Sequence, residues 1–372
     1  MAEFLLREAF NPKGVQEQAG RLLGAWAGFD RVGFEEAVCP KLAALNFGER
    51  AQLIRESLHE FLPQAYPEAL AIILKALPPE LTRSELLGMD NFIIWPLAQF
   101  VSSYGINHFE LSMGALYQMT RCFSAEGDIR FFIEKYPQET LARLAEWAKD
   151  PNVHVRRLVS EGTRPRLPLC RALPAFKKDP SPILPLLEVL KNDPELYVRR
   201  SVANNLNDIA KDNPEVVVAL LSRWNQTPSP ELDWMTRHAL RSLIKKGHAG
   251  ALALLGYGTL GLVELKSLCL TKPRYRLGEE LRFEARLFNP QSRPQRLMVD
   301  FVVHYQKAGG KLSPKVFKAA KPTLGPGETL VVSKGVQLEQ RSTREHYPGL
   351  HKLSLQINGT SMGEVPFILE ID

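Results

Sequence analysis

One segment of the sequence occurs twice, 43 residues apart, and this repeat is the strongest constraint on the fold. DPNVHVRRLV, beginning at Asp150, aligns with DPELYVRRSV, beginning at Asp193. In each copy a helical pattern leads through an Asp-Pro turn into a second helix that starts near Val-Arg-Arg. A period of this length is typical of HEAT-type helix pairs, which stack and leave a continuous face for a long ligand.

Apolar residues keep helical spacing from the N-terminus to about Gly256. The first helices of the two repeats are predicted at 138–149 and 182–192, and a looser third copy begins at Trp234. Earlier helices are predicted at 109–123 and 127–134. We therefore expect an all-α, HEAT-like repeat superhelix as the first domain, over residues 1–258.

The pattern changes to alternating strands after Gly256-Tyr-Gly258, with turn signals such as Gly325-Pro326-Gly327. Strands are predicted at 263–270, 280–288, 297–305, 316–319, 328–334, 351–357 and 366–371. Their number and size predict an all-β, immunoglobulin-like sandwich over residues 259–372. The paired cysteines and central tryptophan of antibody domains are absent from this segment.

Several function classes are disfavoured. The four cysteines lack CxxC spacing, the histidines lack metal-ligand spacing, and no phosphate-binding, dinucleotide-binding or GxSxG motif occurs. We expect no metal and no small-molecule cofactor. No apolar run is long enough for a bilayer span, and the N-terminus does not resemble a signal peptide. A soluble, cytoplasmic protein that makes no membrane contact is expected, with a monomer as the default.

The charge is unevenly distributed along the chain. Residues 1–149 contain 14 Lys and Arg against 19 Asp and Glu, whereas residues 150–250 contain 16 against 11. Residues 251–372 contain 17 against 11, and the whole chain has a net charge of +6. Basic middle and terminal parts favour a polyanionic partner such as nucleic acid, because phosphate neutralisation releases counterions. An ordinary solvated basic surface is the alternative.

Arginines and carboxylates alternate on the second helix of each repeat. Arg200, Asn204 and Asp208 share one stripe, and Arg157 and Glu161 occupy the equivalent stripe of the preceding repeat. We expect this stripe to be one exposed surface. Such pairs could be plain surface ion pairs, worth about 0.3–0.5 kcal/mol each, or part of a functional site.

Three segments resemble a known family. SEGTRPRLP at 160–168, YVRRSVANNLNDIA at 197–210 and TRHALRSLIKKGH at 236–248 are similar to the AlkC-type bacterial alkylpurine DNA glycosylases, and the similarity runs along the whole chain. It implies a monofunctional DNA N-glycosylase that excises 3-methyladenine and 3-methylcytosine from alkylated duplex DNA. The damaged nucleotide would stay stacked, unlike in most glycosylases, and an abasic site would remain.

The resemblance also implies the catalytic carboxylates, which are Glu161, Asp208 and, from a less distinctive segment, Glu126. Alkylation at N3 makes the base a good leaving group, so negative charge beside the developing sugar cation is the help that remains useful. One carboxylate about 4 Å away could contribute roughly 4 kcal/mol, on the order of a thousandfold in rate. A second carboxylate could orient the attacking water.

Phosphate contacts are predicted for a set of basic residues on this surface. The set comprises Arg157, Arg164, Arg166, Arg200, Arg237, Lys245 and Lys246. Arg156 or Arg199 is expected instead to tie neighbouring repeats together, and Asn205 is expected to be structural. Leu169 departs from the family pattern, in which an aromatic residue often follows Arg-Leu-Pro. Trp147, Trp224 or Trp234 could supply that surface, although core positions are more usual for tryptophan. The competing hypothesis for the whole chain is a non-enzymatic HEAT scaffold.

Overall fold

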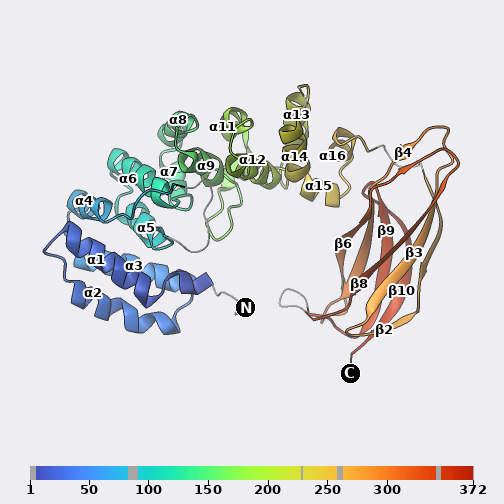
Figure 1. Cartoon of the computed structure of the whole chain (residues 1–372), viewed down its shortest axis with the longest axis horizontal. Coiled ribbons are helices and arrows are strands. Elements are labelled where there is room, and N and C mark those ends of the chain that lie inside the picture. The colour runs from blue at the N-terminus through green and yellow to red at the C-terminus, as the bar shows by residue number, and fades with distance from the viewer. Residues whose placement is uncertain (1–5, 83–90, 228, 258–262, 341–344, 372) are drawn as a thin grey trace. The chain divides into compact units, whose positions relative to one another are not determined.

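The computed structural model describes residues 6–82, 91–227, 229–257, 263–340 and 345–371. They form two compact units, a helical unit of residues up to 213 with 227–239, and a sandwich unit of 214–226 with 240 onward (Figure 1). The domain boundary predicted between residues 258 and 259 lies outside the described residues and stays a prediction. Helices followed by a β-sandwich confirm the predicted fold class.

The helical unit is built from short helices. Its elements are η1 (Leu6–Ala9), α1 (Pro12–Ala25), α2 (Arg31–Val38), η2 (Cys39–Ala44), α3 (Phe47–Phe61), α4 (Tyr66–Lys75), α5 (Ile94–Tyr104), α6 (Phe109–Cys122), α7 (Ile129–Lys135), α8 (Pro137–Trp147), α9 (Val153–Gly162), α10 (Pro174–Lys178), η3 (Ser181–Ile183), α11 (Leu184–Leu190), α12 (Leu196–Ile209) and α14 (Pro230–Ala239). Helix α6 packs on α9, α9 on α12, and α12 on α14, so second helices of successive repeats form one row.

The Asp-Pro turns of the two repeats have the same local structure. Oδ1 of Asp150 accepts the backbone N–H two residues on at 2.7 Å, and Oδ1 of Asp193 does the same at 2.9 Å. Arg156 and Arg199 each donate to the Asp and Pro carbonyls of their own turn. Arg156 also binds the Asp193 carboxylate of the next repeat at 2.6 Å. The predicted role of tying neighbouring repeats together is therefore confirmed for Arg156, whereas the hydrogen bonds of Arg199 stay within its own turn.

The sandwich has two main sheets and a short extra ribbon. Its strands are β1 (Glu264–Leu270), β2 (Arg274–Arg276), β3 (Glu280–Phe288), β4 (Gln295–Arg296), β5 (Val299–Gln306), β6 (Leu312–Ala320), β7 (Thr323–Leu324), β8 (Thr329–Gln337), β9 (Gly349–Ile357) and β10 (Thr360–Glu370). The sheet orders are β1-β3-β8, β2-β10-β9-β5-β6 and β4-β7. The seven predicted strands are all present, and the described residues contain three further short strands, β2, β4 and β7, that were not predicted.

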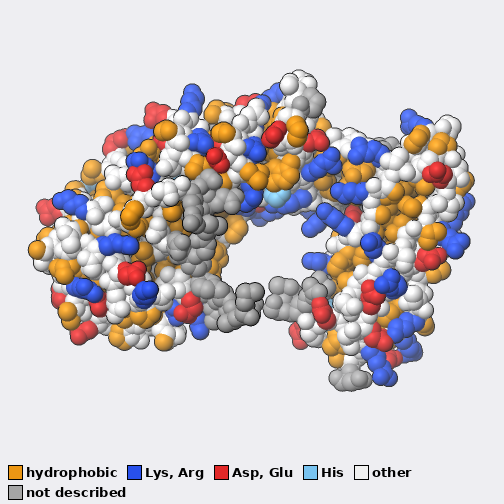
Figure 2. Space-filling view, in the orientation of Figure 1, with side chains coloured by type: hydrophobic (Ala, Val, Ile, Leu, Met, Phe, Trp, Pro, Cys, Tyr) orange, Lys and Arg blue, Asp and Glu red, His pale blue; other side chains and the backbone are white. Residues whose placement is uncertain are grey.

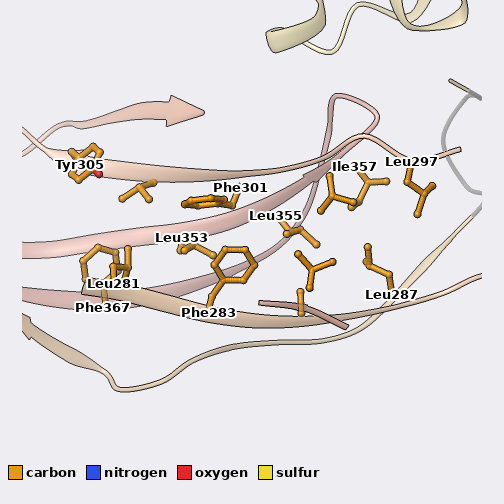
Figure 3. Close-up of a cluster of buried hydrophobic side chains, with 14 of the residues drawn as sticks. Leu281, Phe283, Leu287, Leu297, Phe301, Tyr305, Leu353, Leu355, Ile357 and Phe367 are labelled. Carbon is orange, nitrogen blue, oxygen red and sulfur yellow. The ribbon is translucent and has the colours of Figure 1, made fainter. Parts of the chain in front are cut away.

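Side chains that alternate inward from both sheets fill the sandwich core (Figure 3). Residues of β3 alternate between exposed and buried along the strand. Phe283 of β3 meets Phe301 of β5 with ring centroids 5.0 Å apart. All four cysteines of the chain are free thiols. Apolar burial between the sheets therefore holds this sandwich together without the disulfide that links the two sheets in antibody domains.

Three helices belong to the sandwich unit, namely α13 (Pro214–Trp224), α15 (Arg241–Lys245) and α16 (Ala249–Leu254). Leu252, Leu255 and Tyr257 pack against Met298, which directly precedes β5. The helical pattern up to Gly256 therefore continues beyond the helical unit. Across the described ranges, none of the helices combines the length and the apolar character needed to cross a bilayer.

Candidate active site

Helix α9 positions two of the predicted site residues, Arg157 and Glu161. Its N-cap is Asn152, whose side chain accepts the N–H of residues 154 and 155. The helix ends at Gly162, where a Cβ would lie only 2.6 Å from Ile129 of α7, so only glycine allows this packing. The chain then turns at Thr163, and Arg164 folds back toward Glu161.

The guanidinium of Arg164 bridges the two principal carboxylates. Its Nη1 donates to Glu161 Oε1 at 2.6 Å, and its Nε donates to Asp208 Oδ2 at 2.8 Å. The remaining carboxylate oxygens are also bound, since Ser201 Oγ donates to Glu161 Oε2 at 2.6 Å and Lys211 Nζ donates to Asp208 Oδ1 at 2.7 Å. The structure therefore brings Glu161 and Asp208, from different repeats, onto one cation.

Arg157 links the third predicted carboxylate to the same cluster. Its Nη1 binds Glu126 Oε2, its Nη2 lies 3.5 Å from Glu161 Oε1, and its guanidinium stacks over the Tyr197 ring at 5.0 Å. The order Glu126, Arg157, Glu161, Arg164, Asp208 is a continuous row of alternating charges.

The carboxylates of this row become less buried from Asp208, through Glu161, to Glu126. The Asp208 side chain is 2% exposed, that of Glu161 7%, and that of Glu126 22%. The expectation that these side chains form an exposed surface is therefore wrong. Stacking of α9 against α12 places the stripe between repeats, because a helix in a repeat array has neighbours on both sides. Along α12, Arg200 is exposed, Asn204 is half-buried and Asp208 is buried.

The arginines keep Glu161 ionised despite its burial. Burial alone would raise the pKa of Glu161, but Arg157 and Arg164 outweigh it and hold that pKa below its usual value. Burial likewise opposes the charge on Arg164, and Glu161 with Asp208 raises the pKa of Arg164. A fixed, ionised carboxylate is what stabilisation of a developing cation requires.

The predicted phosphate contacts fall into two groups. Arg157 and Arg164 are buried and paired with carboxylates, so in this structure they are not surface cations. Arg166 is 38% exposed and paired with Asp212. Arg200 is exposed, and Arg237 is 44% exposed and paired with Asp233. Lys245 and Lys246 are exposed on the sandwich unit.

Sequence reasoning missed the residues that hold the cluster in place. Arg130 of α7 is fully buried and donates to the carbonyls of Gly162 and Arg164 at 2.9 and 2.7 Å, and to Arg171 at 2.8 Å. Ser201 and Lys211 bind the carboxylates directly. Only the placement of Arg130 near Glu126 in the sequence could have suggested a role.

Two further expectations are tested by the packing. Asn205 is buried and donates to Ser160 O at 2.8 Å and Thr163 Oγ1 at 3.1 Å, which confirms its structural role. Trp147 and Trp224 are buried, whereas Trp234 is 36% exposed and stacks on His238. Leu169 is 68% exposed and has a positive φ of 61°.

Within the described ranges, no three His, Cys, Asp or Glu side chains gather as metal ligands would.

Comparison with known proteins gives matches over both units. A family model described as a DNA alkylation repair enzyme matches residues 124–243, the stretch that contains Glu126, Glu161 and Asp208. A model of the C-terminal Ig-like domain of the uncharacterised protein YhaZ matches residues 264–371. YhaZ of Bacillus subtilis, itself described as uncharacterised, is 35% identical over 363 residues, which is 97% of this chain and 98% of that protein.

A solved structure extends the similarity to the three-dimensional fold. The Pseudomonas fluorescens alkylpurine DNA glycosylase AlkC, bound to DNA containing an abasic site analogue, is 38% identical with a TM-score of 0.89. The match covers 99% of this chain and 100% of that chain. The chain belongs to the AlkC family. Membership of the AlkC family confirms the resemblance found in the three segments and assigns the chain to the DNA N-glycosylases.

Proposed function

We propose that the chain excises bases made cationic by N3 alkylation, namely 3-methyladenine and 3-methylcytosine, from duplex DNA, leaving an abasic site. Glu161, Asp208 and Glu126 are the proposed catalytic carboxylates. The single observation that best supports this function is the Arg164 bridge, which holds Glu161 and Asp208 together from separate repeats. The reaction would take place in the bacterial cytoplasm, at the nucleoid, with the chain acting as a monomer.

Excision of a cationic base mainly requires a fixed negative charge beside the deoxyribose. Departure of a cationic base leaves positive charge on the deoxyribose, and preorganised carboxylates stabilise it without having to reorient. Ser201 and Arg164 fix the two oxygens of Glu161. We assign Glu161 to stabilisation of the sugar cation and Asp208 to orientation of the water. A neutral, undamaged base would be a poor leaving group, so selectivity would follow from the charge of the lesion.

The basic residues divide into positioning groups and phosphate contacts. Arg157 and Arg164 hold the carboxylates, and we assign phosphate binding to the exposed members of the predicted set. These are Arg166, Arg200, Arg237, Lys245 and Lys246. The sandwich, whose visible face displays many Lys and Arg side chains (Figure 2), would contact DNA as well.

Release of free base from duplex DNA containing N3-methyladenine tests the proposal. The wild-type chain should release the base, whereas Glu161→Gln and Asp208→Asn should each slow release by a factor on the order of a hundred or more while DNA binding persists. Asp193→Asn is the matched control, because Asp193 is also buried and ion-paired with an arginine but lies outside the charged row. It should lose stability and keep its rate per folded molecule.

A non-enzymatic scaffold would release no base at any concentration, and that result for the wild type would refute the proposed activity. The stacked lesion is tested separately by enlarging the N3 substituent. A base that is never swung into a pocket should still be excised with a bulky substituent, whereas a tight pocket would reject it. Rejection by a well-folded, active enzyme would overturn the stacked-base part of the proposal.

A further inference from the structure

An aromatic pair on α14 is connected to the charged row through α12. Trp234 and His238 lie one helical turn apart, and their rings stack with centroids 5.1 Å apart and an interplanar angle of 11°. His238 Nε2 forms a hydrogen bond with Asn204 Oδ1 of α12 at 3.0 Å. Asn204 lies one helical turn before Asp208, the most buried carboxylate of the row. The Trp234 indole is therefore held in a fixed position close to the proposed active site.

The repeats place this pair on the same face as the charged row. When the third copy of the repeat is aligned with the first two, His238 takes the position of Arg157 and Arg200. Helix α12 packs on α9 at one side and on α14 at the other (Figure 1). Equivalent side chains follow one another across an array of stacked repeats. The aromatic pair therefore continues, on α14, the surface that begins with Arg157 on α9.

Trp234 presents apolar surface among exposed cations. It is 36% exposed and is the most exposed of the five tryptophans. Arg200, one turn before Asn204 on α12, is exposed, and the side chain of Arg237, three residues after Trp234, is 44% exposed. An indole flanked by guanidinium groups matches a DNA strand, in which apolar sugar faces alternate with anionic phosphates.

The spacing of the helices indicates which nucleotide this surface reaches. Packed helices lie about 8–10 Å apart, and nucleotides of one strand follow one another about every 3.4 Å along the duplex. Trp234 lies on the helix next to that of Asp208. A strand whose damaged nucleotide lies at Asp208 would therefore meet Trp234 about two or three nucleotides away.

We propose that Trp234 packs its exposed indole surface against the deoxyribose of a nucleotide about two or three positions from the lesion, while Arg200 and Arg237 bind the adjacent phosphates. The contact is remote from the bond that breaks, so Trp234 is a binding residue that holds the damaged strand on the helical unit. The inference rests on the proposed function for its ligand, duplex DNA.

Binding of duplex DNA that contains a stable abasic-site analogue tests this contact without turnover. Trp234→Ala keeps a strong helix former at an exposed helical position and should weaken binding about tenfold. Because no charge is lost, the slope of log Kd against log salt concentration should remain that of the wild type. Trp234→Phe should restore most of the affinity. Val189→Ala, at a 48% exposed apolar side chain of α11, is the matched control and should bind as the wild type does.

Three outcomes of these titrations would overturn the proposal. They are wild-type affinity in Trp234→Ala, an equal loss in Val189→Ala, and a lowered salt slope in Trp234→Ala, which would mean that the lost contacts are ionic.

A propanediol spacer in place of one flanking nucleotide removes the sugar ring and locates the contact. In the wild type, a spacer about two or three positions from the lesion should weaken binding. The same spacer should weaken binding to Trp234→Ala much less, because the contact is already lost and the two changes are coupled. Additive losses at every position tested would rule out the sugar contact.

Excision kinetics separate this inference from the proposed function. Trp234→Ala should slow excision about tenfold at low DNA concentration and change the rate at saturating DNA by less than about threefold. If the wild type binds abasic duplex through Trp234 but releases no methylated base, the proposed function fails and the contact stands. If the wild type releases the base and Trp234→Ala binds and reacts equally well, this inference alone fails.

Discussion

Asp128 lies two residues after Glu126 but in a very different environment. Burial raises its pKa to about 7, although Ser102 and Arg55 oppose the shift. A carboxyl group with a raised folded-state pKa contributes its stability below the unfolded pKa of about 4 and loses it as the pH rises through about 7. Above neutral pH the folded chain therefore keeps a buried carboxylate at a cost in free energy.

Replacement of Asp128 by Asn should remove this pH dependence. The free energy of unfolding of Asp128→Asn, relative to wild type, is expected to rise by about 2–3 kcal/mol between pH 5 and pH 8. Urea unfolding at several pH values measures it. Asp233→Asn, at a side chain that is 61% exposed, should show no such trend. A flat difference for Asp128→Asn would mean that the carboxyl group is not titrating in this range.

At the level of elements, α7 and the end of α9 are joined by one buried guanidinium. Arg130 donates to three carbonyls, of residues 162, 164 and 171, and so fixes the turn that returns Arg164 to Glu161. The geometry of the proposed active site therefore depends on a residue that contacts neither carboxylate. The fixed turn is also the reason that Arg164 reaches Asp208 of the next repeat.

Arg130→Met should destabilise the chain by about 3 kcal/mol or more, because three buried carbonyls lose their donor. The free energy of unfolding of Arg130→Lys should lie between those of Arg130→Met and the wild type, because the ammonium group keeps the positive charge but makes fewer hydrogen bonds. Denaturant unfolding gives the free energies. Arg31→Met is the control, because Arg31 is 45% exposed with a single i,i+4 partner, and it should cost less than about 1 kcal/mol. Equal effects of the two Met variants would contradict the assigned role of Arg130.

At the scale of the whole molecule, the proposed phosphate contacts determine how DNA binding depends on salt. Each true contact contributes about 0.9 to the slope of log Kd against log salt concentration. Arg166→Gln, Arg237→Gln and Lys246→Gln should each reduce that slope by about this amount. Lys13→Gln, at a side chain 86% exposed in the acidic first part of the chain, should leave it unchanged. An unchanged slope for all three test variants would rule out these contacts.

The salt dependence of DNA binding also tests whether the sandwich contacts DNA. Deleting residues from about 260 onward would expose Leu252, Leu255 and Tyr257, which pack against Met298. Substitution of exposed lysines is therefore a cleaner test than truncation. Lys315→Gln combined with Lys318→Gln, both on β6, should lower the slope if the sandwich contacts DNA and leave it unchanged if the sandwich is an inert cap.

Local periodicity in the sequence predicted many of the helices and all of the long strands. Helix and strand patterns, the 43-residue repeat and the Asp-Pro turns depend on neighbours in the sequence, so they predicted α8, α9, α11, α12 and the seven long strands. Short β2, β4 and β7 were missed because two or three residues show no period. Helices α13, α15 and α16 were expected with the helical domain, and only packing assigns them to the sandwich unit.

The sequence by itself determined two fold classes, their order and the residue types available for chemistry, because backbone propensity and apolar spacing are local properties. Tertiary structure alone decided that Glu161 and Asp208 share Arg164, that these two carboxylates are buried, and that α3, α5, α7 and the 169–171 loop line one pocket. These depend on which helices stack and at what depth, and contacts between residues more than 40 positions apart leave no periodic trace along the chain.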